Sequence, residues 1–409
     1  ISMIDLELTD IAHGGACVGH LDGRAVFVRF GLPGERVRVA VTEERSKLLR
    51  GDAIEVLDHP SAHRVEHPWP VAGPLGVGGA ELGHVEFSYQ SVWKTHVLQG
   101  AIRRIGGEDL QHHLDHSGIQ PNVQSFDQDR VLSGWHTRTR VELTVDGDGL
   151  PAMYRHGTRE TVAVGHVPLA VSEIDDLELF AGAWSGQLHP GERIRAVAPS
   201  GSDPMLMVGR NTYWAPQMPA TPYVREDVVV GHELFSYRVR ADGFWQVHRE
   251  AAGQLIAMVT RAAQVEPCDN VVELYSGAGL LTQPLAIAVG SAGTVRSFEG
   301  ARQAVEDARA NLREFSWATS RTAVVDERLV TKVTGDVVIA DPPRAGLGRD
   351  VARAIAGTDA RRIVLVSCDP ASMARDVRAM VDAGRKVVSM ESIDMFPNTH
   401  HFEVVTALA

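Results

Sequence analysis

The chain contains 409 residues, of which 44% are hydrophobic and 22% are charged, as in an ordinary globular protein. This length predicts roughly two or three domains rather than one small core. A formal net charge of -12 argues against a uniformly basic nucleic-acid-binding surface, although local basic patches are compatible with it. No apolar run reaches the roughly 18 residues of a membrane helix, and the first residues are acidic, unlike a basic and apolar leader. We therefore expect a cytoplasmic protein that does not contact a membrane.

Residues 3–58 alternate short strand-like runs with turns, which predicts a small β-barrel in a first domain of residues 1–58. The expected strands are residues 4–8, 24–29, 36–41 and 53–57. The charged segment 43–50 is expected to interrupt them, either as an edge that binds a nucleic-acid backbone or as a solvated loop. Residues 60–83 are rich in Pro, Gly and His, which predicts irregular structure.

Residues 59–230 are predicted to form a central α+β domain, with a helix around residues 91–105 and a strand at 138–145. In residues 231–409 helical and strand patterns alternate, which predicts a doubly wound parallel sheet and an α/β fold class. The expected strands are 270–275, 294–298, 337–340 and 363–368, and the expected helices end at 262, follow 279 and span 302–312.

Two of these strands end at residues that can carry chemistry. The apolar run from Ile363 ends at Cys368, and the run 337–340 ends at Asp341, where two prolines and Arg344 follow. In open α/β sheets ligands bind outside the carboxyl ends of the strands. The sequence therefore predicts that a thiol and a carboxylate face a bound substrate.

Cys368 can be interpreted in two ways. A lone cysteine at a strand end is commonly a small buried hydrophobic residue. The neighbouring Arg344 and a helix start after Pro370 favour a nucleophile, because both could lower the pKa of the thiol. The other cysteines, Cys17 and Cys268, are expected to be structural, and three distant thiols cannot form a disulfide framework or a four-thiolate metal site.

A glycine turn follows the strand predicted at 270–275. Tyr275 leads into Gly277 and Gly279, which let a cofactor approach the backbone closely at the start of a helix. After the next predicted strand, Glu299 stands where an acidic residue can bind ribose hydroxyls. A Gly-x-Gly turn alone is weak evidence for a cofactor site, since many helices begin with one. The following strand and acid favour a nucleoside cofactor, and the missing third glycine argues against a dinucleotide.

Glu403 precedes the final predicted strand, where its carboxylate could act as a general base or be an ordinary surface glutamate. His400 and His401 are adjacent on a segment expected to be extended, so their side chains should point in opposite directions. His59, His63 and His67 share a helical spacing, but nearby prolines make a helix improbable. We therefore expect no metal site.

Motifs in several parts of the chain together resemble the RNA uracil-5 methyltransferase family. They are Phe244-Trp245-Gln246-Val247, Glu273 to Gly279, Asp341-Pro342-Pro343-Arg344, Ser367-Cys368-Asp369-Pro370 and Phe396 to Glu403. Each motif alone is modest, but their shared order is specific. The amino-terminal barrel likewise resembles a TRAM domain, a relative of RNA-binding oligonucleotide barrels.

This resemblance implies a Rossmann-like class I fold that uses S-adenosylmethionine and modifies structured RNA, either transfer or ribosomal RNA. It places Gln246, Tyr275, Glu299 and Asp341 at the cofactor, together with Gly277 and Gly279 of the turn. It also implies that Cys368 is the nucleophile that adds to C6 of uracil and that Glu403 is the base that removes the C5 proton, with Asp341 in the same catalytic site. A monomer is expected.

The chain departs from the family pattern at some positions. Many members carry a four-cysteine iron–sulfur motif in the region that matches residues 67–85, where this sequence has no cysteine, so we predict no cluster. Leu280 and His248 stand where the family usually has asparagine. Two alternatives remain: a cytosine-5 methyltransferase that uses the same C6 addition, or an RNA-binding or folding-assistance protein with a degenerate methyltransferase site.

Overall fold

The computed structural model describes residues 2–409, which form two compact units. The first unit comprises the chain up to Val97, Gln124–Ala196 and Phe396–His401. The second comprises Leu98–Val123, Val197–Met395 and Phe402–Ala409. Among residues 2–409, no helix has both the length and the hydrophobicity needed to cross a membrane. The predicted division into domains at residues 58 and 230 stays a prediction.

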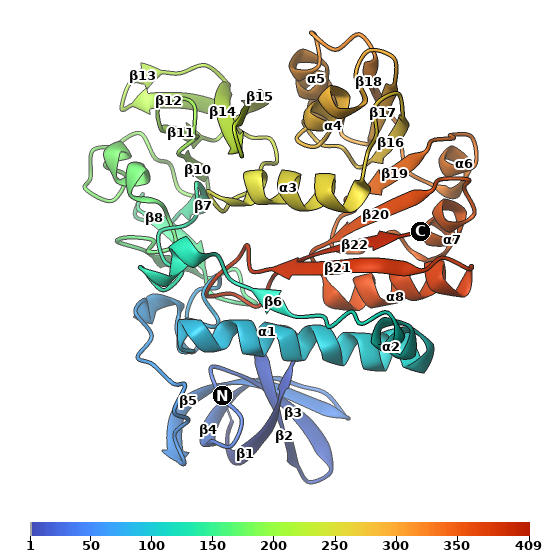
Figure 1. Cartoon of the computed structure of the whole chain (residues 1–409). Coiled ribbons are helices and arrows are strands. Elements are labelled where there is room, and N and C mark those ends of the chain that lie inside the picture. The colour runs from blue at the N-terminus through green and yellow to red at the C-terminus, as the bar shows by residue number, and fades with distance from the viewer. Residues whose placement is uncertain (1) are drawn as a thin grey trace. The chain divides into compact units, whose positions relative to one another are not determined.

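The first unit begins with a closed five-stranded barrel of order β1-β2-β3-β5-β4 (Figure 1). Its strands are β1 (Met3–Ala12), β2 (Ala16–Leu21), β3 (Arg24–Arg29), β4 (Arg36–Glu44) and β5 (Leu48–Asp58). Leu8, Val26 and Val28 are fully buried, because alternate residues of each strand point into the barrel. The predicted barrel is therefore confirmed.

The charged segment 43–50 does not interrupt the barrel, so that expectation is wrong. Glu43 pairs with Arg50 and Glu44 pairs with Leu49, which makes the segment a hairpin between β4 and β5. Inter-strand hydrogen bonding overrides the charge of these side chains because the charges point to solvent at the barrel surface.

The rest of the first unit is largely irregular between short elements. Its strands are β7 (Arg140–Val145), β8 (Pro151–Tyr154), β9 (Thr161–Ala163) and β10 (Arg193–Val197). Short 3-10 turns lie at Pro70–Ala72, Asp127–Arg130 and Ser172–Leu177. The irregular structure predicted for residues 60–83 is confirmed, and helix α1 (Phe87–Ala101) corresponds to the predicted helix at 91–105. A π-helical turn (Ile102–Gly106) and α2 (Gly107–His116) follow it along the chain and belong to the second unit.

The second unit contains an eight-stranded sheet of order β18-β17-β16-β19-β20-β22-β21-β6 (Figure 1). Its strands are β6 (Val123–Gln124), β16 (Asn270–Leu274), β17 (Thr294–Glu299), β18 (Ala318–Thr322), β19 (Val337–Ala340), β20 (Arg362–Ser367), β21 (Val387–Ile393) and β22 (Glu403–Leu408). The strands β16 to β20 pair in parallel, whereas β22 is antiparallel to both β20 and β21. The four residues of β19 are all buried, as expected for a central strand covered on both faces.

One helix precedes the parallel strands, and the others connect successive strands. These helices are α3 (Ala251–Ala263), α4 (Thr282–Val289), α5 (Arg302–Asn311), α6 (Glu327–Val330), α7 (Arg349–Ala356) and α8 (Pro370–Asp382). The chain winds from β16 outward to β18 and then returns to β19 on the other side of β16. The strand order thus reverses between β16 and β19, which is where ligands bind in such sheets. The predicted doubly wound sheet is confirmed.

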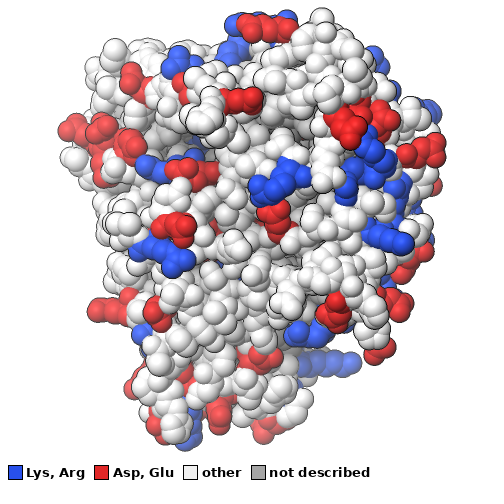
Figure 2. All heavy atoms as spheres, viewed as in Figure 1, with Lys and Arg blue, Asp and Glu red and all other residues white. Residues whose placement is uncertain are grey.

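The second unit also includes a long hairpin that the sequence did not reveal. Strands β14 (Tyr223–Val230) and β15 (Glu233–Arg240) pair along their whole length. The short strands β11 (Met205–Val208), β12 (Asn211–Ala215) and β13 (Met218–Pro219) precede it. On the face shown in Figure 2, acidic and basic side chains are interspersed.

Candidate active site

The predicted catalytic residues lie at one edge of the large sheet. Asp341 follows β19, Cys368 follows β20, and both strands run parallel to β16, so their carboxyl ends meet at the same edge. Ser367 pairs with Val404 in the antiparallel β20–β22 ladder, which brings Cys368 and Glu403 to the same end of that ladder. The Asp341 backbone N–H donates to the Leu274 carbonyl at 3.3 Å and ties the tips of β19 and β16 together.

The surroundings of Cys368 and Glu403 shift the pKa values of both groups. Burial raises the pKa of the Cys368 thiol to about 12, with further increases from the charges of Glu403 and Asp341, while Arg344 opposes them. Burial and the charge of Asp341 likewise raise the pKa of Glu403 well above its ordinary value. The expectation of a lowered thiol pKa is therefore wrong for the protein alone, because burial and the nearby carboxylates outweigh the Arg344 guanidinium.

The Glu403 side chain is only 6% exposed. Its Oε2 atom has no hydrogen-bond partner within residues 2–409. A buried oxygen without a donor is costly, so such an atom suggests a binding or catalytic role. Asp341, like Glu403, has a raised pKa: burial and the charge of Glu299 raise it to about 7.

The glycine turn has the backbone conformation that close cofactor binding needs. Gly277 and Gly279 have positive φ angles of 54° and 89°, and a Cβ added at Gly277 would meet no atom within 4 Å. Tyr275 also has a positive φ of 61°, which is rare for an aromatic residue. Glu299 accepts hydrogen bonds from the backbone N–H groups of Gly277 at 3.0 Å and Ala301 at 2.7 Å. The residues expected at the cofactor thus form a turn held by a carboxylate.

Three further positions that the sequence motifs singled out are Gln246, Leu280 and His248. Gln246 lies between β15 and α3 and is only 8% exposed. Leu280, which replaces the usual asparagine, uses its backbone carbonyl to accept the Tyr237 hydroxyl at 2.8 Å. His248 is buried, and its Nδ1 accepts the backbone N–H of Glu250 at 3.1 Å.

Glu273 is a buried acid whose role the sequence reasoning missed. It lies in β16 and accepts a hydrogen bond from Thr282 Oγ1 at 2.6 Å, which joins the strand to the first turn of α4. Burial raises the pKa of Glu273 to about 8, and the charges of Asp341 and Glu299 add to this effect. An acid inside an apolar strand was the signal that could have identified it.

The segment before Glu403 differs from the sequence prediction. His400 and His401 do not point in opposite directions: their ring centroids are 3.9 Å apart, because residues 397–400 turn rather than extend. The Glu81 carboxylate accepts hydrogen bonds from the backbone and the ring of His400. Burial opposes ionisation of Glu81, but these hydrogen bonds lower its pKa to about 2. Possible ligand atoms of Glu81, His400 and His401 lie within 4.8 Å of one another, and the absence of a metal stays a prediction.

Apolar side chains are buried along residues 67–85, where the sequence predicts no iron–sulfur cluster. The buried residues include Trp69, Ala72, Val77, Ala80 and Leu82. No cysteine lies in residues 67–85, so no thiolate is available there. The absence of a cluster stays a prediction, and these side chains provide a hydrophobic core in its place.

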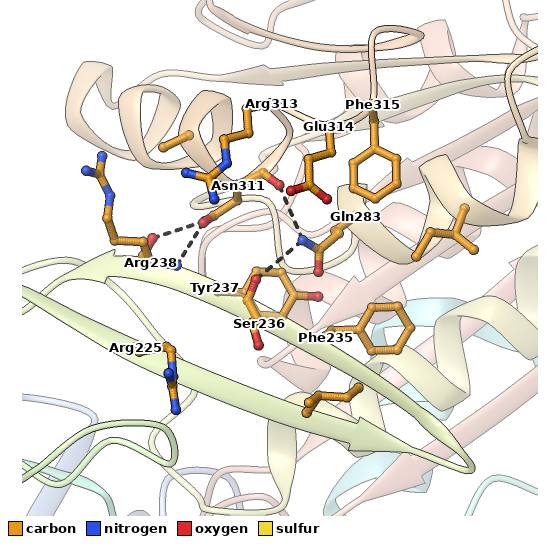
Figure 3. A pocket seen from close by; sticks show the side chains of 13 residues that line it. Arg225, Phe235, Ser236, Tyr237, Arg238, Gln283, Asn311, Arg313, Glu314 and Phe315 are labelled. Atoms are coloured by element: carbon orange, nitrogen blue, oxygen red, sulfur yellow. Dashed lines mark hydrogen bonds between the residues drawn. The ribbon is translucent and has the colours of Figure 1, made fainter.

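A cavity of about 450 Å³ lies between the β14–β15 hairpin and helices α4 and α5 (Figure 3). Gln283 donates to the backbone carbonyls of Ser236 and Asn311 across it, at 3.4 and 3.3 Å. Three arginines and Glu314 also line this cavity. It contains none of the residues predicted at the active site.

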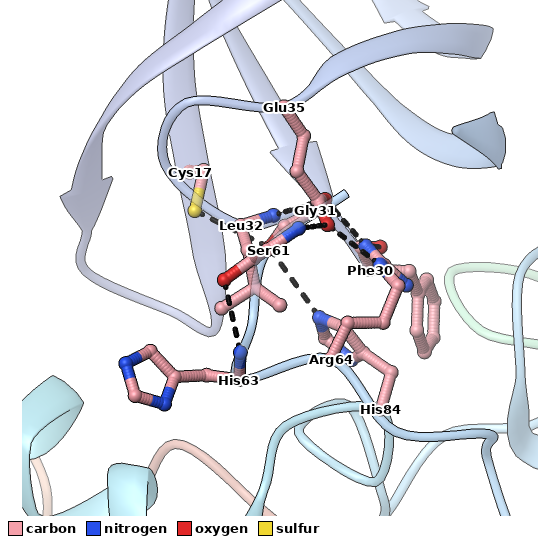
Figure 4. Close-up of polar contacts among 9 residues, drawn as sticks. All are labelled: Cys17, Phe30, Gly31, Leu32, Glu35, Ser61, His63, Arg64 and His84. Carbon is pink, nitrogen blue, oxygen red and sulfur yellow. Dashed lines mark hydrogen bonds and ion pairs between the residues drawn. The ribbon is translucent and has the colours of Figure 1, made fainter. Parts of the chain in front are cut away.

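A buried ion pair connects the barrel to the chain that follows it (Figure 4). Glu35 is fully buried and accepts two hydrogen bonds from Arg64, at 2.7 and 2.6 Å. The buried Cys17 thiol donates to the Gly31 carbonyl at 3.3 Å, which confirms a structural role for this cysteine. Cys268, by contrast, is exposed, so it is not a core residue.

Comparison with known proteins places the chain in a family. A TRAM domain model matches residues 2–54, a tRNA (Uracil-5-)-methyltransferase model matches 326–409, and a Protein-L-isoaspartate(D-aspartate) O-methyltransferase model matches 196–335. An uncharacterized RNA methyltransferase of Bifidobacterium longum is 35% identical over 98% of this chain and 95% of its own length. Another from Streptomyces coelicolor is 34% identical over 99% of this chain and 92% of its own.

A solved structure shares the fold of the whole chain. It is the tRNA (uracil-54, C5)-methyltransferase of Pyrococcus abyssi in complex with S-adenosyl-L-homocysteine. The match has a TM-score of 0.70 and 20% identity, and it covers 99% of this chain and 100% of the other. The predicted class I fold with an amino-terminal barrel is confirmed. The chain therefore belongs to the RNA methyltransferases, with an amino-terminal TRAM domain and a carboxyl-terminal part of the tRNA (uracil-5-)-methyltransferase family.

Proposed function

We propose that this enzyme uses S-adenosylmethionine to methylate C5 of a uridine in structured RNA through a covalent bond between Cys368 and C6. The observation that carries this proposal is the position of Cys368 and Glu403 at the same end of the β20–β22 ladder. Asp341 follows the neighbouring strand, and both carboxylates act electrostatically on the thiol. A nucleophile and a base in one small site are what this reaction requires.

The residues of the glycine turn fit the proposed cofactor. Gly277 leaves open space beside the backbone, and Glu299 presents a carboxylate for ribose hydroxyls. The complex of the structural neighbour with S-adenosyl-L-homocysteine supports this assignment. When bound, the cofactor supplies an electrophilic methyl group on a positively charged sulfonium.

Cys368 and Glu403 have complementary tasks in this reaction. The Cys368 thiolate adds to C6, and the electron pair of the C5–C6 double bond moves to O4 as an enolate. This activates C5, which accepts the methyl group. The Glu403 carboxylate then removes the proton from C5, the double bond forms again, and the thiolate leaves C6. The high pKa of Glu403 suits a group that must take a proton from carbon.

The barrel supports RNA as the acceptor, since TRAM domains resemble oligonucleotide-binding barrels. The target base must leave its stack to reach Cys368, and binding of the flanking strand would assist this. We propose transfer or ribosomal RNA as the substrate. The expected cytoplasmic location and monomeric state stay predictions.

The first test is nucleoside analysis by mass spectrometry after the protein has acted on unmodified RNA with S-adenosylmethionine. The proposal predicts 5-methyluridine, and it predicts that Cys368→Ala abolishes its formation. Formation of 5-methylcytidine would instead support a cytosine-5 methyltransferase. RNA binding without measurable cofactor binding would support the degenerate RNA-binding protein, which the intact set of reactive residues makes the weaker alternative.

A further inference from the structure

Glu403 is positioned by its backbone rather than by hydrogen bonds at both of its own oxygens. It is the first residue of β22 and pairs with Ile393, the last residue of β21. Residues 394–402 form the connection that closes this hairpin. Glu403 Oε2 has no hydrogen-bond partner within residues 2–409, so no bond at this atom fixes the carboxylate, and the connection is the segment that leads into Glu403.

Asn398 is the most constrained residue of the connection. It is 2% exposed and has a positive φ of 64°, a conformation that asparagine tolerates better than most residues. Its backbone carbonyl accepts the N–H of Leu82 at 2.9 Å. Its side-chain amide donates to the Ser133 carbonyl at 3.1 Å. Contacts from separate parts of the chain thus fix this one residue.

Gln90 completes the environment of Asn398 with a pair of reciprocal hydrogen bonds. Its Nε2 donates to Asn398 Oδ1 at 2.9 Å, and its Oε1 accepts the Asn398 backbone N–H at 2.8 Å. A further bond from Nε2 to the Val85 carbonyl, at 3.1 Å, fixes the orientation of the amide. Gln90 is 1% exposed, so solvent cannot replace these bonds.

Lys94 lies one helical turn after Gln90 on the same face of α1. Its side chain is fully buried, and Nζ donates to the Phe396 carbonyl at 3.2 Å. Burying an ammonium group is unfavourable unless it is well hydrogen-bonded, so the buried position of Lys94 needs an explanation. Two side chains of one helix therefore hold the connection at Phe396 and Asn398.

We propose that Gln90, assisted by Lys94, is a positioning residue for the step in which Glu403 removes the C5 proton. The inference rests on the proposed function of Glu403 as the base. Small displacements of a catalytic group have large effects, since a shift of about 1 Å can reduce the rate roughly a hundredfold. Proton removal follows methyl transfer, so a displaced base should stall the enzyme after the methyl group has been transferred.

The test is Gln90→Glu, which keeps the size of the side chain but removes the donor to Asn398 Oδ1. With ordinary uridine RNA and S-adenosylmethionine, we expect kcat to fall roughly tenfold to a hundredfold with little change in KM for RNA. A methylated protein–RNA adduct that resists denaturation should accumulate. The matched control is Gln99→Glu on the same helix, where Nε2 donates to the Pro121 carbonyl at 3.0 Å and normal turnover is expected.

Glu403→Gln distinguishes a failure of the positioning role from a failure of the proposed function. If it accumulates the adduct and Gln90→Glu does not, the positioning role is wrong while the proposed function holds. If Glu403→Gln turns over normally, the assignment of the base is wrong. A Gln90→Glu protein with normal kcat, or one whose methyl transfer and turnover fall equally without an adduct, contradicts the proposal. Should this variant fail to fold, Lys94→Met carries the same test.

Discussion

At the scale of single residues, the proposed active site contains more acidic groups than can ionise at once near neutral pH. Burial raises the pKa of all three groups, and the charges of Glu403 and Asp341 raise that of Cys368 further, so the thiol is protonated near neutral pH in the protein alone. The reaction needs a thiolate. A positive charge in the site would favour it, and the sulfonium of the proposed cofactor is such a charge.

This predicts that the cofactor activates the nucleophile. The reaction of Cys368 with iodoacetamide should be faster with S-adenosylmethionine bound than with S-adenosylhomocysteine, which has similar size but no sulfonium charge. A lowered pKa increases the thiolate fraction roughly tenfold per unit, so the whole pH profile should move to lower pH. Peptide mass spectrometry measures the rate, and the exposed Cys268 serves as internal control. Identical profiles in the two complexes would refute the idea.

Glu273 gives a second prediction at this scale. Its pKa of about 8 in the folded protein exceeds the usual value near 4.3 of an unfolded chain. The folded state therefore binds more protons between these values, and stability falls as pH rises through this range. Glu273→Gln, which removes the charge, should raise the free energy of unfolding at pH 8 by about 1–3 kcal/mol relative to pH 5. Denaturant unfolding at the two pH values measures this difference, and an equal effect at both would show that the carboxyl ionises freely.

At the scale of elements, hydrophobic periodicity predicted the central strands because they are covered on both faces. The apolar runs at 337–340 and 363–368 became β19 and β20 almost unchanged. The hairpin β14–β15 escaped prediction because charged residues such as Arg225, Glu226 and Asp227 lie within it. Cross-strand pairing along its full length stabilises it where propensity does not.

The candidate site could likewise be predicted only in part from local sequence patterns. Its strand-end residues could be predicted, since a parallel sheet brings the ends of its strands together. Gln90 and Asn398 could not, because they are 308 positions apart and only the folded chain joins them. The rings of His400 and His401 were mispredicted because an assumed extended segment is a turn.

The buried ion pair of the barrel allows a stability prediction. Removing one partner of such a pair leaves a buried charge and costs roughly 3–5 kcal/mol. Arg64→Leu should therefore reduce the free energy of unfolding by about that amount, because Glu35 remains fully buried. Arg38→Leu, whose ion pairs with Asp5 and Glu55 are exposed, should cost much less, because solvent screens these charges. Denaturant unfolding compares the two variants, and equal losses would contradict this explanation.

At the scale of the whole molecule, an acidic protein must bind a polyanion. Basic and acidic side chains are interspersed on the face shown in Figure 2. RNA binding must then depend on local groups, and the tip of the β4–β5 hairpin offers Arg45 and Lys47, both exposed. This hairpin is the barrel edge for which the sequence suggested backbone binding.

Replacing Arg45 and Lys47 by alanine should raise KM for RNA and leave kcat unchanged. Each lost phosphate contact should also reduce the slope of log affinity against log salt by roughly one. Arg302→Ala, an exposed arginine of α5, is the control. Steady-state kinetics and binding at several salt concentrations provide the measurement. An unchanged KM and slope would mean that the hairpin tip is a solvated loop.

The central claim is that Cys368 forms a covalent bond with the target uridine. The most direct test is incubation with S-adenosylmethionine and RNA that contains 5-fluorouridine, because fluorine at C5 blocks the final deprotonation. We predict a protein–RNA adduct that resists denaturation, carries the bond on Cys368 and is absent in Cys368→Ala. Sequencing its RNA would identify the substrate. An adduct that persists in Cys368→Ala, or none from a protein that demonstrably binds the cofactor and methylates unmodified RNA, would contradict the account.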